Sequence, residues 1–311
     1  MTLPPRHGRL RRLFTASAAA ATLALTGCAQ AQAKVASAAE VPPPGAVPGP
    51  ALWKVSDADT TIYLFGTVHA LPKDKPWFDN RIATAFRSAD ELVTEIDVSN
   101  VAATAQALAG QGALPKGQVL RTLMTPDNRQ QYEAALVSLG LPVETLDPYE
   151  PWFAAMTLSL LPLLKSGYDA QSGVEVALAS EKGPSKHSGL ETIDQQIALF
   201  DTMPQDQQLS FLDQTVEAIP KAGVSLDAMV AEWIKGDAGK LAELLNAELT
   251  DAALRERLLT QRNANWARWV QQRLGQPGTV FVAVGAGHLA GQGSVQDQLR
   301  KTGIKVQRIW R

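Results

Sequence analysis

Two histidines of this 311-residue chain stand in the same local pattern, and this pattern is the clearest chemical signal in the sequence. Residues 62–69 read Ile-Tyr-Leu-Phe-Gly-Thr-Val-His, and residues 281–288 read Phe-Val-Ala-Val-Gly-Ala-Gly-His. In each, an apolar run typical of a buried strand ends at glycine, and His69 or His288 follows three residues later. Glycine at a strand end permits a sharp turn or a close approach of the backbone to a ligand. Because ligands of open α/β sheets bind at the carboxyl ends of strands, both imidazoles are predicted to face one site.

A third predicted strand, residues 91–97, adds the carboxylates Glu95 and Asp97 near its carboxyl end. Two neutral imidazoles and a carboxylate are a common ligand set for a transition metal that keeps positions open for water. Such an ion would lower the pKa of its bound water and polarise a carbonyl group. The same groups could instead work without metal, with a histidine as general acid or base and a carboxylate that orients it.

Other motifs that would indicate a different chemistry are absent from the sequence. There is no H-E-x-x-H, no G-x-S-x-G and no phosphate-binding P-loop. The glycines of residues 285–291 are similar to a dinucleotide-binding loop, but the third glycine comes one residue late. The next predicted strand also ends without the acidic residue that would bind a ribose, which argues against a nicotinamide cofactor.

Strands are predicted near both ends of the chain, and helices are predicted between them. The expected strands are 52–56, 60–65, 91–97, 186–190, 278–284 and 305–310, and the expected helices include 80–89, 151–164, 173–181, 205–218, 251–274 and 295–301. The first two strands read as a hairpin. Strand–helix–strand units at both ends favour an α/β fold, a mixed sheet flanked by helices with a helix-rich middle insertion.

The first 28 residues are predicted to be a signal peptide. Four arginines precede a short apolar run that is too short to span a bilayer, which is the pattern of an export signal. Leu25-Thr26-Gly27-Cys28 resembles a bacterial lipobox, in which Cys28 would be lipidated; cleavage after an A-x-A site within residues 29–33 is the alternative. Residues 29–51, rich in Ala, Pro and Gly, are predicted to be a tether to the membrane, and 52–311 one α/β domain. The expected location is the cell envelope, periplasmic or secreted.

The net charge and the cysteine count of the chain exclude some classes of partner and of catalytic chemistry. Without its predicted signal, the chain has six more acidic than basic residues, which argues against nucleic acid as a partner. Cys28 is the only cysteine, so the predicted domain has no disulfide and no thiol for catalysis or metal binding. The oligomeric state is not indicated by the sequence.

Several segments together resemble the TraB/GumN family, which includes the Tiki metalloproteases. The segments that carry the resemblance are Leu52–Val55, Tyr63–His69, Glu91–Glu95, Ser188–Thr192, Arg262-Asn263 with Trp266-Ala267, and Val282–His288. The resemblance spans about residues 52–311. It implies an α/β core shared with the erythromycin-esterase and ChaN-like proteins, and a divalent metal ion, manganese or cobalt, with zinc also possible.

The resemblance also implies roles for particular residues. His69, His288 and Glu95 match the family's metal-binding positions, while Glu191 and the Arg262-Asn263 pair match further positions of less certain role. Glu95, Glu191 and Arg262 are therefore the candidate catalytic residues, with Glu191 as a base or a supporting partner.

Simpler roles stay open for several of these residues. Glu191 could merely favour the start of a helix near Ile193, and Arg262 could be an ion-pair partner of Glu256 or of another acidic residue. His187 is expected to be structural, and Trp266 and Trp269 are expected to lie in the core.

The main functional hypothesis is a metal-dependent peptidase that hydrolyses a peptide or protein substrate. The alternative is a non-catalytic envelope protein that binds or sequesters a peptide, haem or metal. A third hypothesis is a metal-free, histidine-based esterase, which resistance to chelators would favour.

Overall fold

The computed structural model describes residues 48–73, 75–97, 110–249 and 251–310. The predicted signal peptide, the lipobox and most of the predicted tether lie outside the described residues, so these segment boundaries stay predictions. In the part of the chain that the structure describes, no helix is both long enough and apolar enough to cross a membrane.

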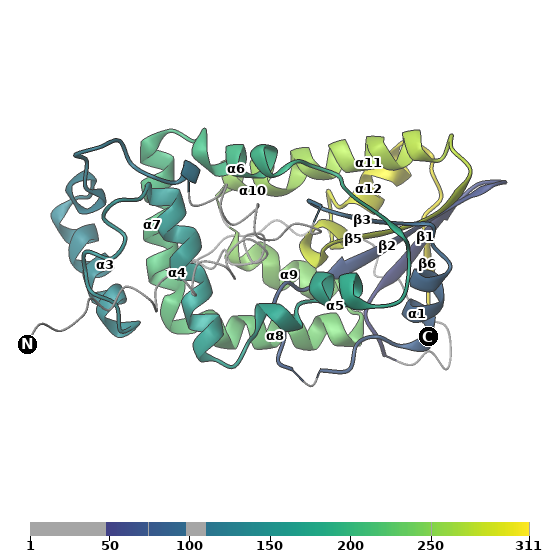
Figure 1. Cartoon of the computed structure of the whole chain (residues 1–311), viewed down its shortest axis with the longest axis horizontal. Helices are drawn as coiled ribbons and strands as arrows, with labels where there is room; N and C mark the ends of the chain where they lie inside the picture. Colours follow the sequence, from purple (N-terminus) through teal and green to yellow (C-terminus); the bar gives the residue numbers. More distant parts are fainter. Residues whose placement is uncertain (1–47, 74, 98–109, 250, 311) are drawn as a thin grey trace, which may run out of the picture.

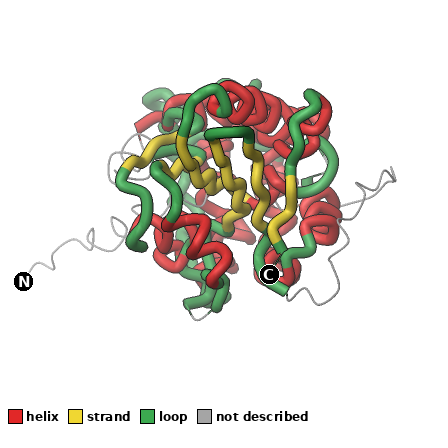
Figure 2. The backbone as a smooth tube through the Cα atoms, turned by 90° about the vertical axis from the view of Figure 1, so that its right-hand side faces the viewer, coloured by secondary structure: helices red, strands yellow, loops and turns green. Residues whose placement is uncertain are grey.

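In the described residues, six strands form one mixed sheet in the order β4-β3-β5-β2-β1-β6. Figure 2 shows this sheet in yellow. The strands are β1 (Leu52–Ser56), β2 (Thr60–Thr67), β3 (Glu91–Thr94), β4 (Lys186–Gly189), β5 (Gly278–Gly285) and β6 (Gln307–Ile309). The four strands β4, β3, β5 and β2 are parallel neighbours, and β1 runs antiparallel to both β2 and β6. The predicted α/β fold and the predicted hairpin of the first two strands are confirmed.

The strand β5 is buried on both faces, which explains its unbroken apolar sequence. Its Val280, Val282 and Val284 belong to a core on one face of the sheet, and Phe281 and Ala283 belong to a core on the other. Each such valine or phenylalanine stabilises the fold by roughly 1.5–3 kcal/mol through its burial. The two cores therefore fix β5 at the centre of the molecule.

Helices cover both faces of this sheet, and others form a separate helical layer (Figure 1). The helices are α1 (Asn80–Arg87), α3 (Pro126–Ser138), α4 (Pro151–Lys165), α5 (Val174–Ser180), α6 (Ile193–Asp201), α7 (Gln205–Ala218), α8 (Ala222–Lys235), α9 (Ala238–Glu248), α10 (Ala252–Arg255), α11 (Gln261–Arg273) and α12 (Val295–Lys301). Helices α11 and α12 pack on one face, and α1, α5, α8 and α9 pack on the other. Helices α3, α4 and α7 lie at the end away from the sheet, around a core of their own that contains Trp152. The predicted helix-rich middle region is thus confirmed.

Two segments near the candidate site differ from the prediction. The third strand stops at Thr94 rather than at Asp97, because the chain turns there and the Thr94 hydroxyl donates to the Ile96 carbonyl at 2.6 Å. The predicted helix over residues 251–274 is interrupted by a π-helical turn, Glu256–Thr260, between α10 and α11. π-Turns occur frequently at functional sites, and this one ends two residues before Arg262.

Candidate active site

The carboxyl ends of β2, β3 and β5 meet at one edge of the sheet. In the strand register, Thr67 of β2 stands beside Gly285 of β5, and Thr94 of β3 stands beside Ala283 of the same strand. His69 follows β2 by two residues, Glu95 follows β3 directly, and His288 lies in the single 3₁₀ turn, η8 (Ala286–Leu289), that follows β5. All three side chains are buried. The fold therefore brings together the three residues that the sequence indicated as ligands.

Gly285 lies at the point where these three side chains meet. A Cβ atom added at Gly285 would lie 3.1 Å from Glu95 Oε1, 3.5 Å from His69 Nε2 and 3.7 Å from His288 Cδ2. Its backbone N–H donates to Glu95 Oε1 at 2.8 Å. Glycine is needed at this strand end because any side chain would enter the space that the three groups share.

Hydrogen bonds determine which nitrogen of His288 carries the proton. Arginine can only donate, so the 3.1 Å contact from Arg262 Nη1 makes Nε2 of His288 the acceptor. The proton is then on Nδ1, which donates to Asn263 Oδ1 at 2.6 Å, while Asn263 Nδ2 donates to the Gly293 carbonyl at 2.9 Å. Burial and the charge of Arg262 lower the pKa of His288 to about 3. His288 is therefore neutral, with the lone pair of Nε2 facing the site.

His69 also has its Nδ1 held by a second group and its Nε2 directed at the site, but the partner of its Nδ1 is a carboxylate. Its Nδ1 lies 2.6 Å from Oε1 of Glu175, and the Thr67 hydroxyl donates to that same oxygen at 2.5 Å. Burial alone would lower the pKa of His69, but the charge and hydrogen bond of Glu175 outweigh it, so this pKa lies above its ordinary value. Because a carboxylate only accepts, Nδ1 of His69 carries a proton and Nε2 faces Gly285.

Arg262 connects the buried carboxylate of Glu95 and the partly buried carboxylate of Glu191. Its Nε donates to both oxygens of Glu191, and its Nη2 donates to Glu191 Oε2 at 2.8 Å and to Glu95 Oε2 at 2.6 Å. Nη1 also donates to the Leu258 carbonyl of the π-turn at 3.1 Å. Gln196 adds bonds from its Nε2 to Glu95 and to Glu191. Burial opposes the ionised form of Glu95, but Arg262 and the two histidines lower its pKa to about 2, so Glu95 is an anion.

Trp266 completes one wall of the site. Its Nε1 donates to Glu191 Oε1 at 3.0 Å, and its ring centroid lies 4.3 Å from that of His288. The Arg262 guanidinium also lies over the indole, 4.7 Å from the ring centroid. Trp266 is a core residue, as expected, and in addition it holds Glu191.

The buried charges of the site are unbalanced. Glu95, Glu175 and Glu191 contribute three negative charges and Arg262 one positive charge, so two negative charges remain when both histidines are neutral. Buried charges are costly unless they are compensated. Protonation of His69 would compensate one of them, and a divalent cation would compensate both.

The donor chemistry fits a divalent metal ion bound by His69, Glu95 and His288. Both imidazoles turn Nε2 toward a common space, and each has its Nδ1 held by a second group, as metal-ligating histidines usually do. Across the described ranges, no three histidine, cysteine or carboxylate side chains already stand in a geometry that would hold an ion. Nε2 of His288 lies 3.8 Å from Glu95 Oε1 and accepts a hydrogen bond from Arg262, so ion binding requires this bond to open.

Other residues that the sequence singled out lie elsewhere or have different contacts. Asp97 is exposed, and His187 of β4 contacts the Pro184 carbonyl through its Nε2 at 3.2 Å. Helix α6 is capped by Thr192 and Gln195, while the carboxylate of Glu191 bonds Arg262. Glu256, the alternative partner of Arg262, lies in the π-turn, and the carboxylates that Arg262 contacts are those of Glu191 and Glu95.

Sequence reasoning missed Thr67, Glu175 and Gln196. Thr67 lies inside the first histidine motif, so its position offered a signal. Glu175 comes 108 residues after Thr67 in an ordinary helix sequence, and no local pattern connects it to His69. Only the packing of α5 against the end of β2 shows this relationship.

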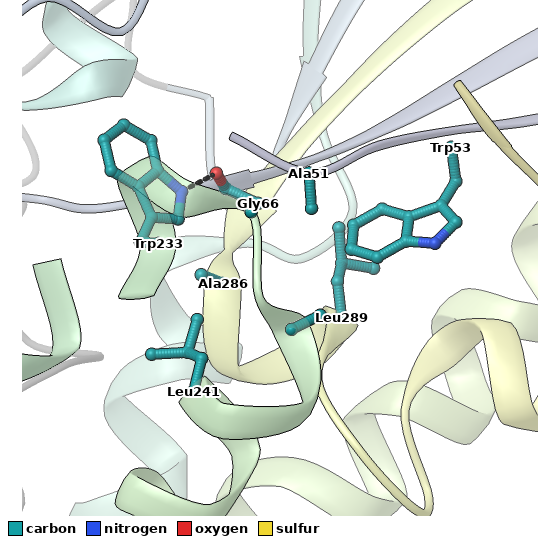
Figure 3. A pocket seen from close by; sticks show the side chains of 9 residues that line it. Ala51, Trp53, Gly66, Trp233, Leu241, Ala286 and Leu289 are labelled. Carbon is teal, nitrogen blue, oxygen red and sulfur yellow. Dashed lines mark hydrogen bonds between the residues drawn. The ribbon is translucent and has the colours of Figure 1, made fainter. Parts of the chain in front are cut away.

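A small apolar cavity lies beside Gly66 of β2 and beside Ala286 and Leu289 of η8 (Figure 3). The residues that line it include Ala51, Trp53, Gly66, Trp233, Leu241, Ala286 and Leu289. The indole of Trp233 donates to the Gly66 carbonyl at 2.7 Å, which holds the carboxyl end of β2 in place. The cavity offers no acid, base or metal ligand, so its contribution to the site is structural.

Fold and site together define an α/β protein with a buried histidine–carboxylate centre at the strand ends, an arrangement suited to hydrolysis. The sequence matches the TraB/PrgY/gumN family over residues 51–308, and the chain belongs to this family.

Its relatives include uncharacterised proteins and a protease. An uncharacterised protein of Treponema pallidum (strain Nichols) is 27% identical, over 80% of each chain. The uncharacterised protein YbaP of Escherichia coli (strain K12) is 26% identical, over 76% of this chain and 87% of its own. Metalloprotease TIKI1 of Danio rerio is 23% identical, over 82% of this chain and 62% of its own, which is a distant similarity. No solved structure matches the chain.

Proposed function

We propose that this protein is a metal-dependent peptidase of the cell envelope. The observation that carries the proposal is the pair of buried histidines, each with Nδ1 held by a second group and Nε2 turned toward the space that they share with Glu95. The distant similarity to a metalloprotease supports the choice of peptide bonds as substrate.

His69, Glu95 and His288 would hold the ion in this proposal. A bound divalent ion supplies an acidified water molecule and polarises the carbonyl of the scissile bond. Gly285 keeps Glu95 in place through its backbone N–H, and Asn263 keeps His288 neutral. The residues that contact these ligands, among them Glu175, Arg262 and Gln196, would position them and balance their charge.

Arg262 and Glu191 would act as a unit beside the ligands. Glu191 accepts bonds from the Nε and Nη2 atoms of Arg262 and from Trp266, which favours a supporting role over that of a free base. Nη1 of Arg262, which donates to Nε2 of His288 in this structure, would be the group to donate a hydrogen bond to a developing oxyanion.

A metal-free hydrolase is the second candidate, and one observation favours it. The Glu175–His69 pair has the hydrogen bond and the raised pKa of a base oriented by a carboxylate. Cleavage that persists in EDTA would support this candidate.

The first experiment is a cleavage assay of the purified full chain on a peptide library, with EDTA treatment and with manganese, cobalt or zinc added back. The proposal expects cleavage that EDTA removes and one of these metals restores, and that His69→Ala abolishes. A chain that binds peptides without cleaving them under every metal condition would instead support the non-catalytic alternative. The matched control is His187→Ala, which changes a histidine outside the site.

A further inference from the structure

Glu175 is a buried acid whose contacts are directed at His69. Its side chain is on the first turn of α5, and it is 7% exposed. One oxygen, Oε1, lies within hydrogen-bond distance of both His69 Nδ1 and the Thr67 hydroxyl. Burying a carboxylate is costly unless it is paired and hydrogen-bonded, and these are the contacts that offset this cost.

The backbone is built to bring Glu175 to this position. Gly173, directly before α5, lies so close to the first histidine turn that an added Cβ would stand 2.2 Å from the His69 carbonyl oxygen. The next residue, Val174, donates its N–H to the Val68 carbonyl at 3.0 Å. These two contacts dock the start of α5 directly on the residues that carry His69, so Glu175 and His69 are fixed relative to each other.

We propose that Glu175 is a positioning residue that sets the metal affinity of the site through His69; this inference rests on the proposed metal-dependent function. The carboxylate holds the proton on Nδ1, which directs the ring and presents the Nε2 lone pair for coordination. Its negative charge also makes the imidazole a stronger ligand. Thr67, through its hydroxyl, holds the carboxylate in turn.

The two histidines differ in the group that holds Nδ1, so the proposed effect of a carboxylate applies to His69 and not to His288. Asn263 fixes the Nδ1 proton of His288 in the same way, but it is an uncharged amide whose nitrogen is bonded to Gly293. Both rings are thus oriented, but the partner of Nδ1 is a carboxylate for His69 and an uncharged amide for His288. Loss of the Glu175 charge is therefore expected to weaken metal binding even where the geometry is kept.

The test is the dissociation constant for Mn²⁺, Co²⁺ and Zn²⁺, measured by calorimetric titration of the purified full chain. Glu175→Gln keeps an acceptor for Nδ1 and removes the charge, while Glu175→Ala removes both. We expect metal binding to weaken by about 10- to 100-fold, most in Glu175→Ala. Thr67→Val, which leaves Glu175 in place, should weaken it less. Glu181→Gln, an exposed acid at the end of the same helix, is the matched control and should bind as the wild type does.

The thermal unfolding midpoint of each metal-free variant separates affinity from folding. Folded Glu175→Gln and Thr67→Val variants that bind metal as tightly as the wild type would overturn the inference and leave the proposed function standing. If Glu175→Ala fails to fold, the metal affinities of Glu175→Gln and Thr67→Val still test the inference. A wild-type chain that binds none of the three ions would overturn both the inference and the proposed function.

Discussion

Nη1 of Arg262 lies 3.1 Å from Nε2 of His288 and donates to the ring nitrogen that a metal ion would need. The guanidinium also contacts Glu95, so in this structure it bridges two of the three proposed ligands. Arg262 is thus the cation of the metal-free site. An ion that binds His288 must displace one hydrogen bond of Arg262, and the bonds to Glu191 can remain.

Replacement of Arg262 should destabilise the metal-free protein strongly. Arg262→Ala removes the cationic partner of Glu191 and leaves the buried Glu95 unpaired, and breaking a buried ion pair in this way costs about 3–5 kcal/mol in the free energy of unfolding. Urea denaturation of the EDTA-treated full chain measures the change. Arg268→Ala, an exposed arginine on the same helix, should change it by less than about 0.5 kcal/mol. Equal effects of the two substitutions would contradict the network described here.

Acid should weaken the metal-free fold through His288. The pKa of His288 is about 3 in the folded chain and 6.5 ordinarily, because burial and Arg262 disfavour its charged form. Between these values the unfolded chain binds one more proton, so the free energy of unfolding falls as the pH drops from about 6.5 toward 3. The slope is at most about 1.4 kcal/mol per pH unit from this group. Chemical denaturation across this range measures it, with a shallower slope expected in His288→Gln.

Glu95 and His69, which lie beside His288, also have shifted pKa values and therefore contribute to the pH dependence outside the range from 6.5 to 4.5. Glu95, with its pKa lowered to about 2, contributes stability that is present above about pH 4.5 and is lost as the pH falls toward 2. His69 has a raised pKa, so its contribution is full below pH 6.5 and is lost as the pH rises through its folded value. His187→Gln, outside the site, should keep the wild-type slope, and a flattened slope in this control would contradict the assignment to His288.

A methyl group at Gly285 should disable the site while the fold survives. The added Cβ of Gly285→Ala would lie 3.1 Å from Glu95 Oε1, closer than an ordinary contact, and small displacements of reacting groups can cost about 100-fold in rate. We expect kcat/KM for peptide cleavage to fall by about that factor. In Gly287→Ala the new atom meets the flexible end of Leu245 at 3.3 Å, so this neighbouring control should stay close to the wild type. Similar losses in the two variants would argue against the shared space at Gly285.

The sequence predicts the sheet and the placement of His69, Glu95 and His288 at one edge of it, for physical reasons. Strands buried on both faces are continuous apolar runs, and glycine at a strand end followed by histidine marks the functional edge in β2 and β5. Parallel strands place such residues together whatever their separation in the chain. His69 and His288 could therefore be paired from local pattern alone.

The groups that hold these ligands could not be predicted in the same way. Glu175 reaches His69 only because α5 docks on the turn after β2, and this packing depends on the whole fold. The π-turn before Arg262 is also not visible in the helical pattern of residues 251–274, since it shifts the helix by a single residue. The contact between Glu175 and His69 and the π-turn both depend on tertiary packing rather than on the local sequence.

The lipobox prediction can be tested independently of the site. If Cys28 is lipidated, the full chain should fractionate with membranes, and Cys28→Ser should release it to the soluble fraction or leave it unprocessed. Fractionation and intact mass measure this, since a lipidated amino terminus adds the mass of its acyl chains. A soluble wild-type chain cleaved within residues 29–33 would show that the A-x-A site is used instead.

Metal binding by the wild-type chain and by His288→Ala, compared by equilibrium dialysis, tests the central claim most directly. We predict about one divalent ion per wild-type chain, loss of that ion in His288→Ala, and retention in His187→Ala. If a folded wild-type chain retains no manganese, cobalt or zinc, or if His288→Ala retains as much as the wild type, the metal centre at His69, Glu95 and His288 is contradicted.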